Sequence, residues 1–190
     1  MLNKIDIPCV ILSGGKSSRM GADKSLLPFG DYNTLIEYQY HKLSKIFSKV
    51  YISSKIDKFD FDFDIIYDTS DIYSPMVALN SILNFLDDEK VFIVTVDNPF
   101  LTQKTINKLI STSYDTDIAV AQDDEKLHNL CGVFSKTCLN KISQLLDDNN
   151  HKINMLLKNM DSKIVQFENK KEFLNINKKQ DYELALKEKM

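Results

Sequence analysis

The sequence predicts an α/β fold of three layers, in which helices cover both faces of a mostly parallel central sheet. Two short apolar runs, residues 9–12 and 91–96, are rich in β-branched side chains and lack polar alternation, as central strands do when both faces are covered. Strand and helix patterns alternate along the chain, which is typical of right-handed βαβ units. No internal repeat or linker interrupts the 190 residues, so we expect one domain over residues 1–190.

The remaining elements follow from weaker patterns. Further strands are expected at residues 50–53, 65–67, 117–121 and 163–167. Apolar side chains recur on one helical face at residues 36, 40, 43 and 47, and again at 76, 79, 83 and 86. Pro75 suits the first turn of the second helix, and Thr102 suits the N-cap of a third. Residues 147–152 are expected to form a surface loop, and the Lys-rich tail from Lys178 a solvated helix.

The composition excludes several classes of protein. The net charge is −3, which argues against a nucleic-acid-binding surface, although a few local cations can still hold a nucleotide. No apolar run has the length of a signal peptide or a membrane span. The three cysteines lack the paired spacing of a disulfide framework or a zinc site, and they suit a reducing compartment. We therefore expect a cytoplasmic protein with no membrane and no nucleic-acid partner.

A Gly-rich segment, residues 12–24 (LSGGKSSRMGADK), directly follows the first strand and contains three of the five glycines. Glycine lets the backbone approach a phosphate closely, and successive N–H groups can then bind an anion. Arg19 and Lys24 add positive charge, and ligands of parallel α/β sheets bind at this edge. The spacing fits neither a Walker A motif nor a dinucleotide fingerprint. The alternative is a plain β-to-α connection without a ligand.

This segment resembles the L-x-G-G-x-S-x-R-M-G-x-D-K signature of the molybdenum cofactor guanylyltransferases, the MobA family, with Ser13 where Ala is usual. The resemblance implies a Rossmann-like nucleotidyltransferase fold. It also implies catalytic roles for Arg19 and Lys24. The nucleotide contacts that it implies in this segment are Leu12, Ser13, Gly14, Gly15 and Lys24.

Asp97 follows the buried run 91–96 and should face the same sheet edge as the Gly-rich loop. Mg²⁺ prefers one or two carboxylates together with phosphate oxygens and water, so Asp97 is a candidate metal ligand. The alternative is that Asp97 caps the next helix. The segment 96–100 resembles the family's D-x-P segment, which implies that Asp97 binds the metal and the nucleotide and is catalytic.

Other polar residues at predicted strand ends are weaker candidates. The resemblance implies a nucleotide-contacting aspartate after residues 65–67, where Asp68 and Asp71 both lie. Ser53 ends another strand where the family often has Asn, and it is expected to contact the nucleotide. Residues 74–78 (SPMVA) depart from the family's Gly-Pro-Leu-Ala-Gly, which puts the contacts of that loop in doubt.

Asn175 and Asn177 lie in a segment that resembles the family's N-[IV]-N before the last helix. Side chains two apart in an extended segment share a face, so both could bind the acceptor substrate. The alternative is a cap for the final helix. His128 lies near the family's His-Pro, but Asn129 replaces the proline, so a substrate contact by this histidine stays an open alternative that no other residue supports.

The resemblance implies transfer of GMP from GTP to the terminal phosphate of molybdopterin, with Mg²⁺ as cofactor and release of pyrophosphate. Alternatives are CTP as donor, another acceptor such as a sugar phosphate, or a non-catalytic nucleotide-binding protein. We expect a monomer, with transient contacts to other molybdenum cofactor biosynthesis proteins or to recipient molybdoenzymes.

Overall fold

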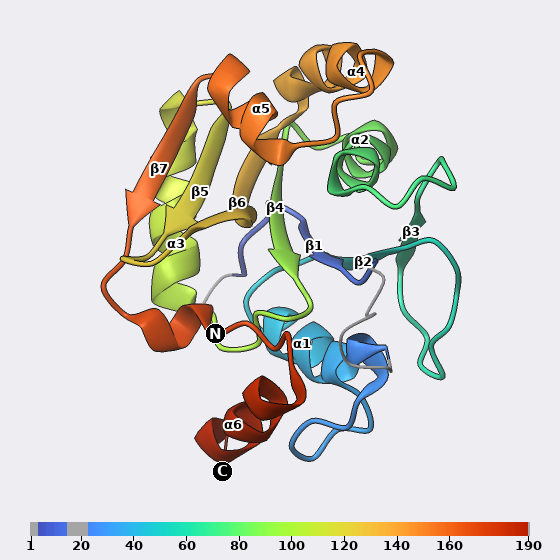
Figure 1. Ribbon diagram of the computed structural model, residues 1–190, viewed down its shortest axis with the longest axis vertical. Helices are drawn as coiled ribbons and strands as arrows, with labels where there is room; N and C mark the ends of the chain where they lie inside the picture. Colours follow the sequence, from blue (N-terminus) through green and yellow to red (C-terminus); the bar gives the residue numbers. More distant parts are fainter. Residues whose placement is uncertain (1–3, 15–22, 190) are drawn as a thin grey trace.

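The computed structural model describes residues 4–14 and 23–189, and it has the predicted three-layer α/β architecture (Figure 1). Within these residues the strands form one seven-stranded sheet in the order β3-β2-β1-β4-β6-β5-β7. The neighbouring pairs are parallel except for the two that β6 makes with β4 and β5. The prediction of a mostly parallel sheet is therefore confirmed.

Each predicted strand is confirmed to within one residue at either end. The strands are β1 (Cys9–Leu12), β2 (Val50–Ser54), β3 (Ile65–Tyr67), β4 (Lys90–Thr95), β5 (Ile118–Gln122), β6 (Leu127–Ser135) and β7 (Ser162–Gln166). The α-helices are α1 (Leu35–Leu43), α2 (Pro75–Phe85), α3 (Gln103–Thr112), α4 (Leu139–Asp147), α5 (Ile153–Asn159) and α6 (Lys179–Lys189). Short 3₁₀ helices are η1 (Lys24–Leu26), η2 (Ser113–Asp115), η3 (Lys136–Cys138) and η4 (Lys170–Phe173).

The hydrophobic core is divided by the sheet into two clusters. Alternate residues of β1 enter each one: Cys9 and Ile11 pack with α1, α3 and α6, whereas Val10 and Leu12 pack with α2, α4 and α5. All four residues of β1 are buried. This explains why the strand is apolar throughout, since a strand covered on both faces has no solvent side.

The helices begin where capping side chains satisfy their first N–H groups. Thr34, Ser74 and Thr102 cap α1, α2 and α3, and Pro75 is the first residue of α2. The prediction that Phe47 continues the first helix is wrong, because α1 ends at Leu43. Phe47 still packs into the same core, which explains the misleading periodicity. In the described part of the chain, no helix combines the length and the apolar character that a membrane crossing needs.

The sequence analysis missed β6, α4 and α5. The predicted surface loop is the short connection between α4 and α5, and β6 lies antiparallel between β4 and β5. Gly132 permits this close packing: a Cβ there would lie 2.0 Å from the carbonyl oxygen of Ala119 on β5. Through β6, the parallel strands β3, β2, β1 and β4 are joined to β5 and β7 in one sheet.

Candidate active site

The carboxyl ends of β1 and β4 lie next to each other in the sheet. Leu12 pairs with Thr95, and the backbone N–H of Val96 donates to the Leu12 carbonyl at 3.1 Å. The side chain of Gln39, buried in α1, donates to the carbonyls of Thr95 and Val96 at 3.3 and 3.1 Å. Gln39 was not predicted, and it fixes the backbone that leads to Asp97.

Lys24, Asp97 and Asn177 come together at this edge from three distant parts of the chain. The Lys24 ammonium lies 3.0 Å from Asp97 Oδ2 and 3.1 Å from Asn177 Oδ1. The hydroxyl of Thr95 donates to the other carboxylate oxygen of Asp97. Thr102, and not Asp97, caps α3. A cation, a carboxylate and an amide therefore share one half-buried position.

The segment that contains both predicted asparagines is docked against the end of β4. The backbone N–H of Ile176 donates to the carbonyl of Asp97 at 3.0 Å, and the Ile176 side chain is buried in the core. At the start of α6, Asp181 accepts from the backbone N–H groups of Asn177 and Lys178 at 2.9 and 2.8 Å. The Asn177 side chain instead accepts from Lys24, so a cap is not its role.

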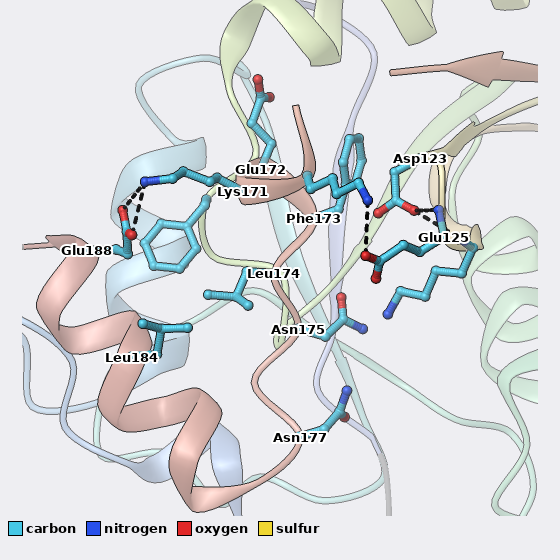
Figure 2. Close-up of a pocket in the computed structure, with 13 residues that line it drawn as sticks. Asp123, Glu125, Lys171, Glu172, Phe173, Leu174, Asn175, Asn177, Leu184 and Glu188 are labelled. Carbon is cyan, nitrogen blue, oxygen red and sulfur yellow. Dashed lines mark hydrogen bonds and ion pairs between the residues drawn. The ribbon is translucent and has the colours of Figure 1, made fainter. Parts of the chain in front are cut away.

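A pocket of about 570 Å³ lies beside this segment. Asn175 and Asn177 line it, together with Phe100 and residues of η4, α6 and the turn before β6. Figure 2 shows Asp123 and Glu125 on one side of the segment and Leu184 and Glu188 on the other. Among the described residues, the buried Oδ1 of Asn175 has no hydrogen-bond partner. The pocket size and its mixed apolar and polar lining suit a small molecule.

His128 contacts two residues that line the pocket, Asp123 and Phe173. Its Nε2 lies 2.9 Å from Asp123 Oδ2, and its ring stacks on Phe173 with 4.5 Å between centroids. Asp123 also accepts from the backbone N–H groups of Glu125 and Lys126 at 2.8 Å. Burial lowers the pKa of His128, although the contact with Asp123 opposes that shift. His128 thus ties the turn before β6 to η4.

A second cluster lies at the ends of β2 and β3. The Ser53 hydroxyl donates to Asp68 at 3.4 Å, and the Lys55 ammonium lies 3.8 Å from the same carboxylate. Burial raises the pKa of Asp68, and Lys55 and Ser53 oppose the shift. The Ser53 carbonyl accepts from the backbone N–H of Ser13 at 3.0 Å, which joins this cluster to the Gly-rich loop. Asp71 is exposed, so the structure groups Asp68 with Ser53.

The departure from the family pattern at residues 74–78 is the start of α2. The Ser74 hydroxyl accepts from the backbone N–H of Met76 at 3.2 Å. His151, from the connection between α4 and α5, contacts the same hydroxyl through Nδ1 at 3.0 Å. Ser74, which stands where the family has glycine, therefore caps α2 and also contacts His151.

The Gly-rich loop is described at its two ends. Leu12 and Ser13 are buried, and Gly14 is exposed. The predicted residues Gly15 and Arg19 lie outside the described residues. Within the described part of the chain, no group of three or more His, Cys, Asp or Glu side chains is placed to hold a metal. A site with one carboxylate, such as Asp97, suits Mg²⁺ when the substrate supplies phosphate oxygens.

Comparisons with known proteins agree with this geometry. Residues 9–164 match the MobA-like NTP transferase domain. The molybdenum cofactor guanylyltransferase of Campylobacter jejuni subsp. doylei is 40% identical over 181 residues, which cover 94% of each chain. The enzyme of the same name from Helicobacter pylori is 33% identical over 187 residues, covering 95% of this chain and 92% of the relative.

The fold also agrees with a solved structure. The molybdopterin-guanine dinucleotide biosynthesis protein A of Archaeoglobus fulgidus superposes with a TM-score of 0.83 at 16% identity, covering 97% of this chain and all of that one (100%). The predicted nucleotidyltransferase fold is thereby confirmed. The chain belongs to the MobA-like NTP transferase family, as a relative of the molybdenum cofactor guanylyltransferases.

Proposed function

We propose that this protein transfers GMP from GTP to the terminal phosphate of molybdopterin and releases pyrophosphate. Its relatives at 40% and 33% identity carry the name of that activity. The observation that carries the proposal is the contact of Lys24 with both Asp97 and Asn177, of which Asn177 also lines the pocket. In this proposal the Gly-rich loop binds phosphate, Asp97 binds the metal and the pocket receives the acceptor.

The nucleotide is proposed to lie on the side of β1, β2 and β3. Its triphosphate would bind the loop through Leu12, Ser13, Gly14 and Gly15, and its nucleoside would extend toward Ser53 and Asp68. The two groups are linked by the backbone contact between Ser13 and Ser53. In parallel α/β sheets a ligand binds beyond the carboxyl ends of the strands, and the described residues of this group lie at or next to those ends.

The acceptor is proposed to occupy the pocket beside Asn175 and Asn177. The unpartnered Oδ1 of Asn175 can accept from an N–H of a pterin ring, while Phe100 and Phe173 provide apolar surface. The acceptor phosphate would then lie toward Lys24, because Asn177 both lines the pocket and contacts that lysine.

The reaction needs charge neutralisation and positioning more than proton transfer. The second pKa of a phosphate monoester is roughly 6, so the attacking oxygen is already anionic near neutral pH and no general base is required. Lys24 would stabilise negative charge on the reacting phosphates, and Arg19 is proposed to do the same. Asp97 would hold Mg²⁺, which neutralises phosphate charge when bound.

We further propose that the protein acts as a monomer in the cytoplasm. Its product would pass by transient contact to other cofactor biosynthesis proteins or to a recipient molybdoenzyme. Gel filtration with light scattering tests the first point, and a mass near twice that of one chain would overturn it.

The test is a thermal-shift series with GTP, CTP, UTP and ATP, each with and without Mg²⁺, followed by turnover of GTP with molybdopterin. A ligand at about 100 times its Kd adds about 2.7 kcal/mol, which corresponds to roughly 5–10 °C for a domain of this size. We expect the largest shift with GTP and Mg²⁺, and pyrophosphate release only when molybdopterin is present. A preference for CTP would change the substrate, and no shift with any nucleotide would favour the non-catalytic alternative.

A further inference from the structure

Lys58, in the connection between β2 and β3, joins the two described ends of the Gly-rich loop. Its ammonium donates to the Ser13 carbonyl at 3.1 Å and to Asp23 Oδ2 at 2.5 Å. Its side chain is 17% exposed. Asp23 in turn accepts from the backbone N–H of Ser25 and begins η1, which contains Lys24. Lys58 thus contacts both described ends of the loop, although it lies outside the signature in the sequence.

Two further features lie next to the Ser13 carbonyl that Lys58 contacts: the Ser13 hydroxyl and Gly14. The Ser13 hydroxyl is buried, with the residue 3% exposed, and among the described residues it has no hydrogen-bond partner. Leaving a buried hydroxyl unpaired is unfavourable. At Gly14, which follows Ser13, a Cβ would meet no atom of the described residues within 4 Å.

These features match the chemistry of a phosphate. An ammonium has three donors, and Ser13 and Asp23 account for two of those of Lys58. A hydroxyl donor together with a third ammonium donor suits an anion with several acceptor oxygens.

We propose that Lys58 and the Ser13 hydroxyl bind the triphosphate of the nucleotide, and that Asp23 holds the Lys58 ammonium in place before the nucleotide arrives. This inference rests on the proposed function, and it adds a cation that lies outside the family signature. Burial raises the pKa of Asp23, but its contacts with Lys58 and Ser25 outweigh burial and lower it, so the carboxylate stays charged near neutral pH.

The experiment compares the wild type with Lys58→Met in equilibrium binding of GTP, GMP and guanosine. We expect Lys58→Met to weaken GTP binding about 10- to 100-fold, because one charge-assisted contact is lost, and to change guanosine binding by less than about 2-fold. GMP should fall between them. Lys136→Met is the matched control, because Lys136 also donates to a carbonyl, that of Leu86 at 2.7 Å, at the opposite end of β4.

A second role for Lys58 is to neutralise Asp23, which would otherwise repel the triphosphate. The double variant Asp23→Asn/Lys58→Met separates the two roles. Direct binding predicts that GTP affinity stays low in the double variant, whereas recovery to the wild-type value would overturn the proposal. An equal loss for GTP and guanosine would also overturn it, since that result indicates a disturbed loop.

The outcomes distinguish this inference from the proposed function. If the wild type binds GTP and Lys58→Met binds it equally well, the inference alone fails. If the wild type binds no nucleotide, the proposed function fails as well. Circular dichroism checks folding, and Lys58→Gln, which can still donate to the Ser13 carbonyl, is measured against the same criteria if Lys58→Met does not fold.

Discussion

The two sides of the candidate active site are held in different ways. On the β4 side, Lys24 contacts Asp97 and Asn177 within 3.1 Å, and the segment 173–177 is hydrogen-bonded to the backbone of Asp97. On the β2–β3 side, Asp68 lies 3.4 Å from the Ser53 hydroxyl and 3.8 Å from the Lys55 ammonium. The polar contacts of the first side are therefore shorter than those of the second, and the second side is the more loosely held of the two.

Two departures from the family pattern lie on or near the looser side. Ser53 stands where Asn is usual, and residues 74–78 lack the usual glycines, whereas Asn175 and Asn177 fit the pattern of the β4 side. Preorganised charges are the main source of transition-state stabilisation, so the tight side is where rate should depend on single residues. The looser side should affect binding of the nucleotide more than rate. Four substitutions test this division.

Asp97→Asn should have the largest effect. We expect Mg²⁺-dependent pyrophosphate release to fall about 10³-fold, because the carboxylate is the proposed metal ligand, while the fold is retained. Turnover at saturating GTP over a Mg²⁺ titration measures this. Asp71→Asn, an exposed site, is the control. Activity near the wild-type level would remove Asp97 from the metal site.

Lys24→Ala should lower kcat by about 10²- to 10³-fold, the scale for loss of one preorganised electrostatic group. The loss should exceed any change in the KM for GTP, because Lys24 lies on the β4 side. Steady-state kinetics separate the two parameters. A variant that changed only KM would place Lys24 on the nucleotide side and break the comparison.

Asp68→Asn should raise the Kd for GTP about 10-fold and leave kcat within about 2-fold, because one charge-assisted hydrogen bond to the nucleoside is lost. Asp71→Asn again serves as the control, and it should bind GTP like the wild type. The opposite result would exchange the roles of the two aspartates.

Glu172→Ala should have the smallest effect. Glu172 accepts from the Thr102 backbone and from the Thr102 and Thr105 hydroxyls at 3.1, 2.8 and 2.6 Å, so it joins η4 to the start of α3. Losing such a capping contact costs about 1 kcal/mol, or roughly 2–4 °C in Tm. Glu188→Ala, which breaks an exposed ion pair with Lys171, should change Tm less.

The effect of Glu172→Ala should depend on pH. Burial raises the pKa of Glu172, but the hydrogen bonds from Thr105 and Thr102 outweigh it and lower the pKa. A carboxyl with a lowered pKa stabilises the fold above its unfolded pKa, about 4.3, and loses that contribution as the pH falls through the folded value. The difference in Tm should therefore be present at pH 7 and shrink toward pH 3. A constant difference would assign the effect to packing.

Six of the seven described strands could be predicted because these strands, and the caps of the helices between them, have local signals. The runs 9–12 and 91–96 are apolar on both faces, and Thr102 precedes a periodic segment. The strand β6 has no such signal, because its first half carries the polar residues His128 and Asn129. The register of its pairing with β5 shifts between Val120 and Ala121, and its position in the sheet depends on pairing with both β4 and β5. In the sequence, Gly132 argues against a strand, because glycine weakens strand interiors. The structure shows that a side chain at this position would clash with the Ala119 backbone.

The candidate site was predictable where a residue type follows a strand or a signature. Asp97 and Asn177 were found in this way, and the structure places both against Lys24. Gln39 and Lys58 were missed, because a helix glutamine and a loop lysine have no local pattern that indicates a contact with a distant strand end. Their contacts depend on tertiary packing, which the hydrophobic periodicity of a single sequence does not predict.

The bond from the Ile176 backbone to Asp97 has a consequence for the timing of synthesis. The last strand of the described chain, β7, ends at Gln166, so every described strand leaves the ribosome before residues 173–177. Domains fold as the N-terminal part emerges. At that stage Lys24 would lack Asn177 and the pocket would lack one wall, so the proposed acceptor site would be completed later than the strand ends of the proposed nucleotide site.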